Sequence, residues 1–278
     1  MIQIHHAEGW EISDAEALWG NAFGDEPEFQ QSFYRLCAPE GPLVFSEERL
    51  VRSMLALPEL ALVLADGTRL RAGYVYALAT DPSCRRRYCA TILLEVAAGL
   101  GRSQGLDCLL AVPARPALFP FFEQNGFQTG FYLREVRADP VPARLEEIPP
   151  EQYAALREGL LAGRAHTAYT NSQLTFQRGL CPEPGSGLYR LELAHGPGCA
   201  AVENWDREPL VKELLCAPGD EEQGAAACAA LCGGPARVRV PADGEADGTP
   251  FAVVRWSEGT PASIRDGLRG GWLGLAFD

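Results

Sequence analysis

Three consecutive arginines, Arg85, Arg86 and Arg87, are the strongest chemical signal in the sequence. They stand between an apolar run that predicts a strand and one that predicts a helix. A helix N-terminus carries backbone N–H groups without intrahelical partners and the positive end of the helix dipole, so it attracts anions. Basic side chains beside it predict a pyrophosphate site. A solvated basic turn without a ligand is the alternative that this feature alone leaves open.

The charge of the whole chain has the opposite sign. Its 278 residues include 37 acidic and 24 basic ones, which gives a formal net charge of −13, and Lys212 is the only lysine. The electrostatic field of such an acidic chain repels phosphate backbones and anionic membranes and attracts cations. We therefore expect a small cationic or amine substrate as the partner, with neither nucleic acid nor a membrane, and leave the oligomeric state open.

Cysteine usage and the N-terminal residues bear on the compartment. Nine cysteines form no C-x-x-C pair, and Cys228 and Cys232, which share one face of a predicted helix, have no histidine nearby. The segment 243–248 resembles the start of a calcium loop, but Val254 occupies the place of the required glutamate. No secretory signal or membrane span is visible. These features predict a cytoplasmic protein with reduced, buried cysteines and no metal.

The elements that position the arginines follow from the apolar pattern. We expect a strand over 70–80, a loop over 81–87, a helix over 89–100, a strand over 106–112 and a helix over 118–124. Two apolar strands joined by a helix are typical of parallel pairing with a right-handed crossover. The loop then lies at the carboxyl end of the first strand.

A proline-rich, acidic stretch near the middle predicts a domain boundary. We expect a first domain over residues 1–137, a linker over 138–150 and a second domain over 151–278. Residues 211–218 echo residues 75–82, and an Ala-rich helix and a strand follow the second copy as a helix and a strand follow the first. The echoes suggest a duplicated domain, although short apolar strings also match by chance.

The order of these segments resembles a known family. Residues 76–90, the apolar helix after them, the strand near 109–114 and the segment 118–127 look like the GNAT superfamily of acyl-CoA-dependent N-acyltransferases. Its members have a Gln/Arg-x-x-Gly-x-Gly/Ala loop before a long helix and commonly a Tyr-Glu-x-x-Gly-Phe segment. The start, near Trp19 and Asp25, is similar to bacterial members with a second, degenerate GNAT-like half.

The resemblance implies a fold and a site. The fold is α/β, a GNAT-like mixed sheet flanked by helices, followed by a smaller or degenerate GNAT-like α/β domain. The function is direct transfer of an acyl group, with acetyl-CoA as cosubstrate, to a primary amine. The implied cofactor-binding residues are those of the splayed strand end and of the loop: Leu78, Ala79, Thr80, Arg85, Arg86, Arg87, Tyr88, Cys89 and Ala90.

Two residues depart from the family pattern. Tyr88 stands in the place of the central glycine, which allows close approach of the pyrophosphate because it has no side chain. Phe122 stands in the place of the tyrosine that protonates the departing thiolate, and phenylalanine has no proton to donate. These departures support an alternative, a catalytically impaired GNAT-fold protein that binds CoA or a small cation without turnover.

The sequence does not select a general base. Asp25, Glu26 and Glu123 are candidates, and each is also an ordinary surface carboxylate. The chain ends in an apolar run closed by Asp278, and the resemblance to tandem GNAT-like enzymes implies that this terminus accepts the proton of the amine. A last strand that completes a second sheet is the alternative. Acidic residues after Cys216 predict that the second half binds no CoA.

Overall fold

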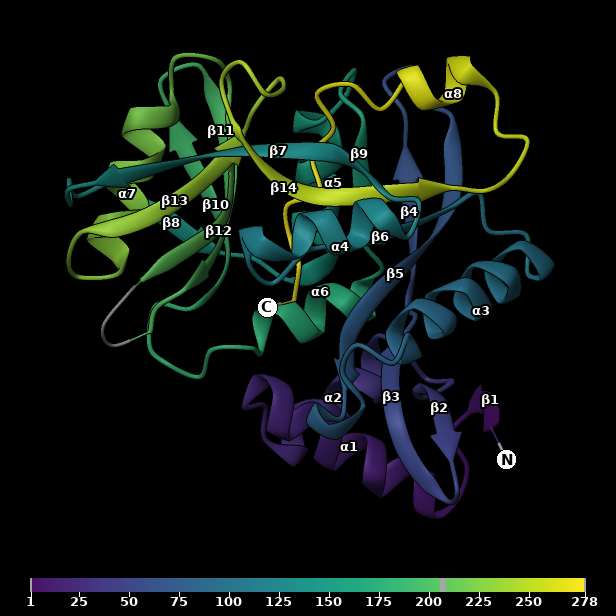
Figure 1. The fold of residues 1–278 in the computed structure, drawn as a ribbon. Helices are drawn as coiled ribbons and strands as arrows, with labels where there is room; N and C mark the ends of the chain where they lie inside the picture. Colours follow the sequence, from purple (N-terminus) through teal and green to yellow (C-terminus); the bar gives the residue numbers. More distant parts are fainter. Residues whose placement is uncertain (1, 206–208, 278) are drawn as a thin grey trace. The chain divides into compact units, whose positions relative to one another are not determined.

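The computed structural model describes residues 2–205 and 209–277 (Figure 1). Contacts between residues divide the chain into two compact units. The first unit comprises Met1–Ala61, Leu70–Thr129 and Ala252–Arg265, and the second comprises Leu62–Arg69, Gly130–Phe251 and Asp266–Asp278. Each unit is described by itself below.

The first unit is a mixed sheet with helices against it. Its strands follow the order β1, β2, β3, β5, β6, β14, in which only β5 and β6 pair in parallel. The elements are β1 (Ile2–His6), α1 (Trp10–Phe23), α2 (Pro27–Leu36), β2 (Leu43–Glu47), β3 (Leu50–Ala56), β5 (Arg69–Thr80), η1 (Pro82–Cys84), α3 (Cys89–Ser103), β6 (Cys108–Ala111), η2 (Pro116–Leu118), α4 (Phe119–Gln124) and β14 (Thr249–Trp256). Strand β4 (Glu59–Val63), the short α8 (Ala262–Asp266) and the first residues of β5 and β14 cross the division between the units.

Helix α3 forms because its apolar residues recur at helical spacing. Leu93, Leu94 and Ala97 are fully buried on one face, where they join an apolar cluster with residues of β2, β3 and β6. Burial of this stripe is the main stabilisation of such a helix. The parallel β5–α3–β6 unit predicted from the apolar pattern is confirmed, and so is the α/β fold class.

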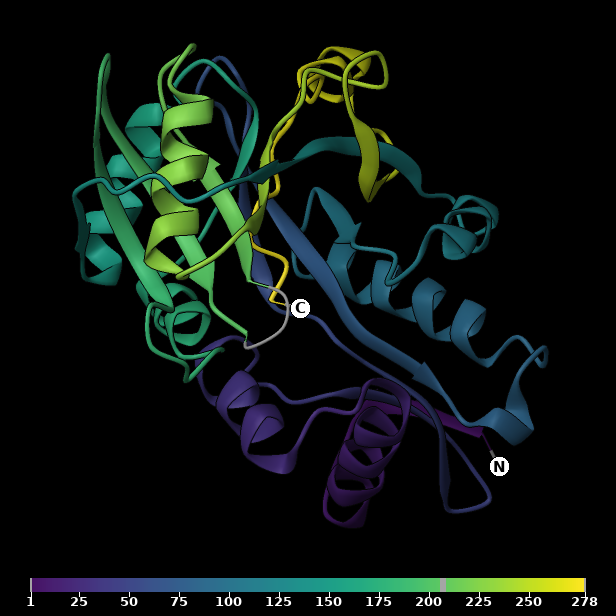
Figure 2. The same ribbon diagram turned by 90° about the vertical axis from the view of Figure 1, so that its left-hand side faces the viewer.

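In the second unit the sheet runs in the order β7, β13, β12, β11, β10, β8, with β12 and β13 the parallel pair. Helices α7 and α5 cover opposite faces of it (Figure 2). The elements are β7 (Gln128–Ala138), β8 (Leu145–Glu147), α5 (Pro150–Leu160), β9 (His166–Ala168), α6 (Asn171–Arg178), β10 (Gly187–Leu193), β11 (Gly196–Glu203), β12 (Leu210–Leu215), α7 (Glu221–Leu231) and β13 (Ala236–Pro241). The strand–helix–parallel strand order of β12, α7 and β13 repeats that of β5, α3 and β6.

The observed division differs from the boundaries expected from sequence. The second segment of the first unit ends at Thr129, before the expected end of the first domain at residue 137. The first unit also includes Ala252–Arg265, because β14 pairs with β6. The expected linker over 138–150 contains β8, which pairs with β10 and is therefore part of the second sheet. None of the helices within residues 2–205 and 209–277 has the length and apolar character that a membrane span requires.

Candidate functional site

Strand β5 departs from regular pairing near its carboxyl end. Its parallel pairing with β6 runs to Val75 opposite Ala111, where β6 ends before the Val112-Pro113 dipeptide. Proline has no N–H to donate, which stops the ladder there. Beyond this point β5 continues against β3 alone, so the two parallel strands separate at the end where the loop begins.

A β-bulge lies at the same place. Met54 of β3 faces Ala79 and Ala56 faces Tyr76, so one residue of β3 opposes two of β5. Ala77, within the bulge, has a φ of 51°. A bulge takes backbone groups out of the regular ladder and re-aims the chain, and bulges are frequent next to active sites. Of the expected cofactor-binding residues at the strand end, Leu78 lies within the bulge, and Ala79 and Thr80 follow it directly.

The loop after β5 is held by a local turn. The carboxylate of Asp81 accepts hydrogen bonds from the backbone N–H of Ser83 at 2.7 Å and from its hydroxyl at 2.6 Å. The hydroxyl and backbone bonds from Ser83 lower the pKa of Asp81. Cys84 is buried and anchors the turn, whereas Arg85, Arg86 and Arg87 are exposed. The three arginines therefore project from an ordered loop.

The N-terminus of α3 is open to a ligand. No side chain caps it, and the first intrahelical bond runs from the N–H of Ile92 to the carbonyl of Tyr88. The N–H groups of the preceding helical residues, Cys89, Ala90 and Thr91, therefore have no carbonyl partner within the helix. These groups and the helix dipole together favour an anion.

Tyr88 adopts the conformation that a glycine would adopt. Its φ of 62° and ψ of 8° are left-handed, and its side chain is 74% exposed. The ring extends into solvent, so the helix N-terminus keeps a glycine-like backbone. The departure from the family pattern that Tyr88 represents is thus accommodated in the backbone.

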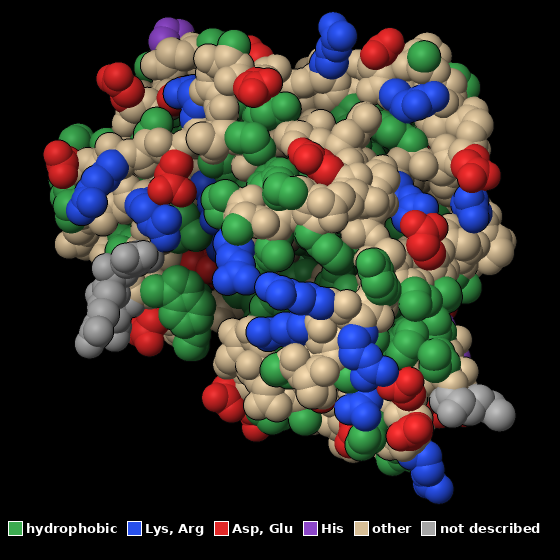
Figure 3. Space-filling model, in the orientation of Figure 1, with side chains coloured by type: hydrophobic (Ala, Val, Ile, Leu, Met, Phe, Trp, Pro, Cys, Tyr) green, Lys and Arg blue, Asp and Glu red, His purple; other side chains and the backbone are tan. Residues whose placement is uncertain are grey.

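The arginines have different surroundings. Arg87 forms an ion pair with Glu47 of β2 at 3.3 Å, which raises the pKa of Arg87, and it contacts the Cys84 sulfur at 3.5 Å. Within the described part of the chain, neither Arg85 nor Arg86 forms a close ion pair like that of Arg87 with Glu47, although the charge of Arg85 helps to lower the pKa of Asp81. Figure 3 shows Lys and Arg side chains gathered over the region where β5 leads into α3. Arg87 thus fastens the loop, while Arg85 and Arg86 have charges available for a ligand.

Phe122 occupies an apolar environment. It is 5% exposed in α4, belongs to the same buried cluster as α3, and packs edge-to-face against Phe121 and Phe127 at centroid separations of 5.4 and 5.3 Å. The ring is therefore a core residue, and whether a hydroxyl at this position would serve catalysis stays a prediction.

The candidate bases lie apart from any shared arrangement. Asp25 accepts a hydrogen bond from the indole N–H of Trp19 at 2.6 Å, which gives it a structural role between α1 and α2. Glu26 and Glu123 are exposed. Asp278 lies outside the described residues. The structure brings together the strand end and the loop, and it selects no base.

Two features of this region escaped the sequence reasoning. Ala77 at the bulge gives no signal, because alanine does not favour a positive φ. The turn cap from Asp81 had a signal, since Asp-Pro-Ser is typical of a turn in which the aspartate accepts a bond two residues on. Such a cap supports the loop without touching a ligand.

Comparisons with known proteins show what the chain is similar to. Residues 3–130 match the family model of the acetyltransferase (GNAT) domain. Three solved structures, each 12% identical in sequence, share the fold over 93% of this chain. They are a conserved protein of unknown function from Enterococcus faecalis (TM-score 0.70, 73% of that chain covered) and GCN5-related N-acetyltransferases from Kribbella flavida (0.68, 72%) and Anabaena variabilis (0.68, 73%).

At this identity the structures show the fold alone, and the family assignment depends on the match over residues 3–130. No curated protein matches the chain by sequence. The matched region contains the bulge of β5, the arginine loop and the open N-terminus of α3. Residues 3–130, somewhat less than half of the chain, are thus similar to the acetyltransferase (GNAT) domain.

Proposed function

We propose that the protein transfers an acetyl group from acetyl-CoA to a primary amine by direct attack. The observation that carries this proposal is the pairing of a bulged strand end with an open helix N-terminus at the two ends of one short loop. Members of the family use acetyl-CoA or CoA, and the similarity of residues 3–130 to the family therefore supports this cosubstrate, whereas the acceptor class is our inference.

The residues of the loop fit a pyrophosphate. The N–H groups of Cys89, Ala90 and Thr91 and the guanidinium groups of Arg85 and Arg86 supply donors and positive charge. Hydrogen bonds to charged groups contribute about 1.5–3 kcal/mol each. The remainder of the chain is acidic, so this local reversal of sign directs an anionic cosubstrate to one place.

The strand end supports the chemical step. The amine nitrogen attacks the thioester carbon, a C–N bond forms, and the carbonyl oxygen gains negative charge. The C–S bond then breaks and the thiolate departs. Backbone N–H groups near Leu78 and Thr80 would stabilise the oxyanion, as preorganised donors do in acyl transfer generally.

Proton transfer accompanies the step at two points. An alkylammonium has a pKa of about 10, so a base must accept its proton before attack. A thiolate with a pKa of about 8.5 leaves without an obligatory acid and can take up the second proton, which the attacking nitrogen loses as the amide forms, and Phe122 therefore does not prevent turnover. The net charge of −13 favours a cationic acceptor.

A second candidate function is binding without turnover. The buried, purely apolar surroundings of Phe122 favour it, because nothing at that position donates a proton to the leaving group. The two functions share the acetyl-CoA site and differ in whether an amine releases the thiol.

Calorimetry with acetyl-CoA tests the site. Replacing Arg85 and Arg86 by alanine should weaken binding by about 10- to 100-fold and reduce its dependence on salt, because charge-assisted bonds are lost. Arg102→Ala, at the other end of the same helix, is the matched control and should bind like the wild type. Equal binding by the wild type and the double variant would show that the site is misplaced.

A further inference from the structure

The second unit contains a buried ion pair that the transfer reaction does not use. Arg157 of α5 and Glu213 of β12 have side chains that are 2% and 0% exposed. The guanidinium donates to both carboxylate oxygens, from Nε to Oε1 at 2.8 Å and from Nη2 to Oε2 at 2.9 Å. Removing two charges from water is costly, and buried pairs of this kind are best known for fixing one arrangement of the chain.

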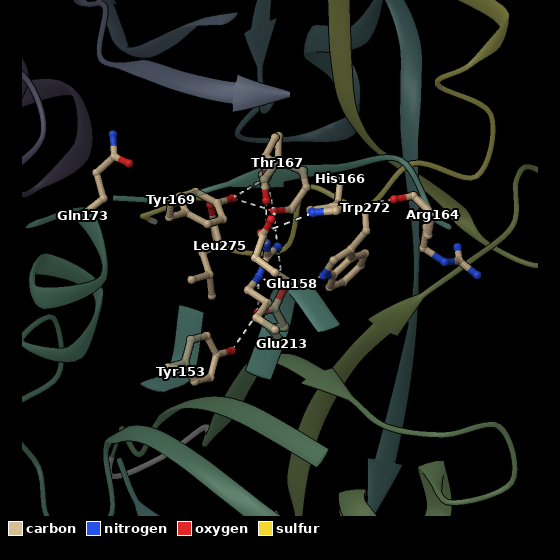
Figure 4. A network of polar contacts seen from close by, with 12 residues as sticks. Tyr153, Glu158, Arg164, His166, Thr167, Tyr169, Gln173, Glu213, Trp272 and Leu275 are labelled. Atoms are coloured by element: carbon tan, nitrogen blue, oxygen red, sulfur yellow. Dashed lines mark hydrogen bonds and ion pairs between the residues drawn. The ribbon is translucent and has the colours of Figure 1, made fainter. Parts of the chain in front are cut away.

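The pair contacts the C-terminal segment, residues 271–277. Figure 4 shows Tyr153 and Trp272 approaching Glu213 from opposite sides, and their hydroxyl and indole N–H donate to its two oxygens at 2.7 and 2.5 Å. Arg157 Nη2 also donates to the backbone carbonyl of Leu273 at 3.4 Å. The carboxylate and the guanidinium thus each bind part of the segment.

Two hydroxyl groups bind the same stretch of backbone. The carbonyl of Leu273 accepts hydrogen bonds from Thr167 Oγ1 at 2.7 Å and from the Tyr169 hydroxyl at 2.5 Å. The Tyr169 hydroxyl also lies 2.6 Å from the carbonyl of Leu275. Alternate carbonyls of the segment are therefore recognised by side chains of one short region.

Strand-like bonds complete the attachment. The N–H of Trp272 donates to the carbonyl of Ala165 at 2.8 Å, and the carbonyl of Trp272 accepts the N–H of Thr167 at 3.0 Å. These bonds accompany an isolated bridge between His166 and Trp272 rather than a full strand. The segment is docked by individual groups and does not extend the sheet.

The fit includes one glycine and a set of apolar side chains. Gly274 has a φ of 73°, and a Cβ there would collide with Glu213 Oε2 and approach Trp272 Nε1 to 2.8 Å. The segment's larger side chains, those of Trp272, Leu273, Leu275 and Phe277, are all 0% exposed. The site thus requires an extended apolar peptide with a glycine in the middle.

We propose that Arg157, Thr167, Tyr169 and Glu213 form a peptide-binding dock for residues 271–277, which behave as a bound peptide that can leave and rebind. The name dock refers to these four residues. Most of its contacts are to backbone carbonyls, so it sets the register of the segment. It recognises an extended C-terminal peptide of this chain.

The experiment separates the segment from the chain without removing it. A recognition site for a specific protease is inserted between the exposed residues Arg265 and Asp266, the folded protein is cut, and the cut protein is passed through a gel-filtration column. We expect the fragment that begins at Asp266 to elute with the remainder of the protein. Elution of the fragment alone from the cut wild type would overturn the proposal.

Variants show whether the dock is responsible. Glu213→Gln keeps the size of the side chain and removes its charge, and it should speed release of the fragment by about a hundredfold or more. Glu147→Gln is the matched control, because Glu147 also pairs with an arginine, Arg178, but at the surface. Equal release from wild type and Glu213→Gln would contradict the proposal.

A milder variant covers the case in which Glu213→Gln does not fold. Tyr169→Phe removes only the hydroxyl that bonds to Leu273 and Leu275, and it should speed release by about tenfold, the effect of one buried hydrogen bond. In the uncut protein, it should also speed hydrogen exchange at the Trp272 amide. Wild-type release and wild-type exchange in this variant would overturn the proposal.

Discussion

Replacing Tyr88 by glycine or alanine separates two properties of this residue, its left-handed backbone and its ring. A non-glycine residue in the left-handed region costs about 1–2 kcal/mol. Glycine removes that cost. It also lowers the stability of the folded protein by about 0.4–1 kcal/mol, because it gives the unfolded chain more conformational entropy. The ring is 74% exposed and contributes little burial. Tyr88→Gly should therefore raise the free energy of unfolding by about 0–1.6 kcal/mol.

Tyr88→Ala keeps the backbone cost and removes the ring. Because the ring extends into solvent, we expect the alanine variant to bind acetyl-CoA within about threefold of the wild type, a change of about 0.6 kcal/mol. Tyr88→Gly should bind at least as tightly as the wild type. Urea unfolding measures the first effect, and calorimetric titration with acetyl-CoA measures the second.

The result that would refute this reasoning is a loss of acetyl-CoA affinity greater than tenfold in Tyr88→Ala. Such a loss would mean that the ring contacts the cosubstrate, for example by stacking on the adenine, and does not simply extend into solvent. A Tyr88→Gly variant less stable than Tyr88→Ala would likewise contradict the left-handed conformation.

Three further predictions concern other residues. Phe122→Tyr should lower stability by about 1–3 kcal/mol in urea unfolding, because its hydroxyl is buried without a partner, yet raise kcat more than it changes KM; unchanged kcat would place the acid elsewhere. Deleting Asp278 should lower kcat by about a hundredfold, the scale of a lost general base, and leave acetyl-CoA affinity unchanged; wild-type kinetics would remove the terminus from the reaction. Since Ser83 lowers the pKa of Asp81, the stability from this carboxylate is present above its unfolded pKa of about 3.9 and lost as pH falls further. The destabilisation caused by Asp81→Asn should shrink from pH 5 to pH 3 in urea unfolding, and a constant difference would contradict it.

The local part of the fold could be predicted from sequence because it is encoded locally. The apolar runs of β5, α3 and β6 show both the elements and their parallel pairing, and three arginines before a helix indicate an anion site. The conformation of Tyr88 could not be predicted in this way, since tyrosine disfavours a positive φ and only the surrounding loop imposes it.

Long-range pairing accounts for the differences between the expected domain boundaries and the two compact units. Val254 of β14 pairs with Leu110 of β6, although 144 residues separate them in the sequence. Nothing in the local pattern of residues 252–265 indicates that they belong to the first unit. Similarly, the short run around Glu146 reads as a linker, and only its partner Arg190 in β10 makes it a strand.

The dock shows how far composition can indicate a buried site. For the apolar C-terminal run, one expectation was a last strand that completes a sheet, and residues 271–277 are indeed buried, but they form single bridges and not such a strand. Glu213 was a visible signal, because a charged residue in the apolar strand Leu210–Leu215 must find a partner when it is buried. The identity of that partner, Arg157, depends on the fold.

One measurement tests the central claim most directly: titration of the wild-type protein with acetyl-CoA, followed by addition of primary amines and detection of free thiol. The account predicts binding of acetyl-CoA that the Arg85 and Arg86 double alanine variant loses, and thiol release that depends on the amine. Binding without thiol release for any amine would favour the non-catalytic function. Absence of acetyl-CoA binding to the wild type would contradict the proposed site and the proposed reaction together.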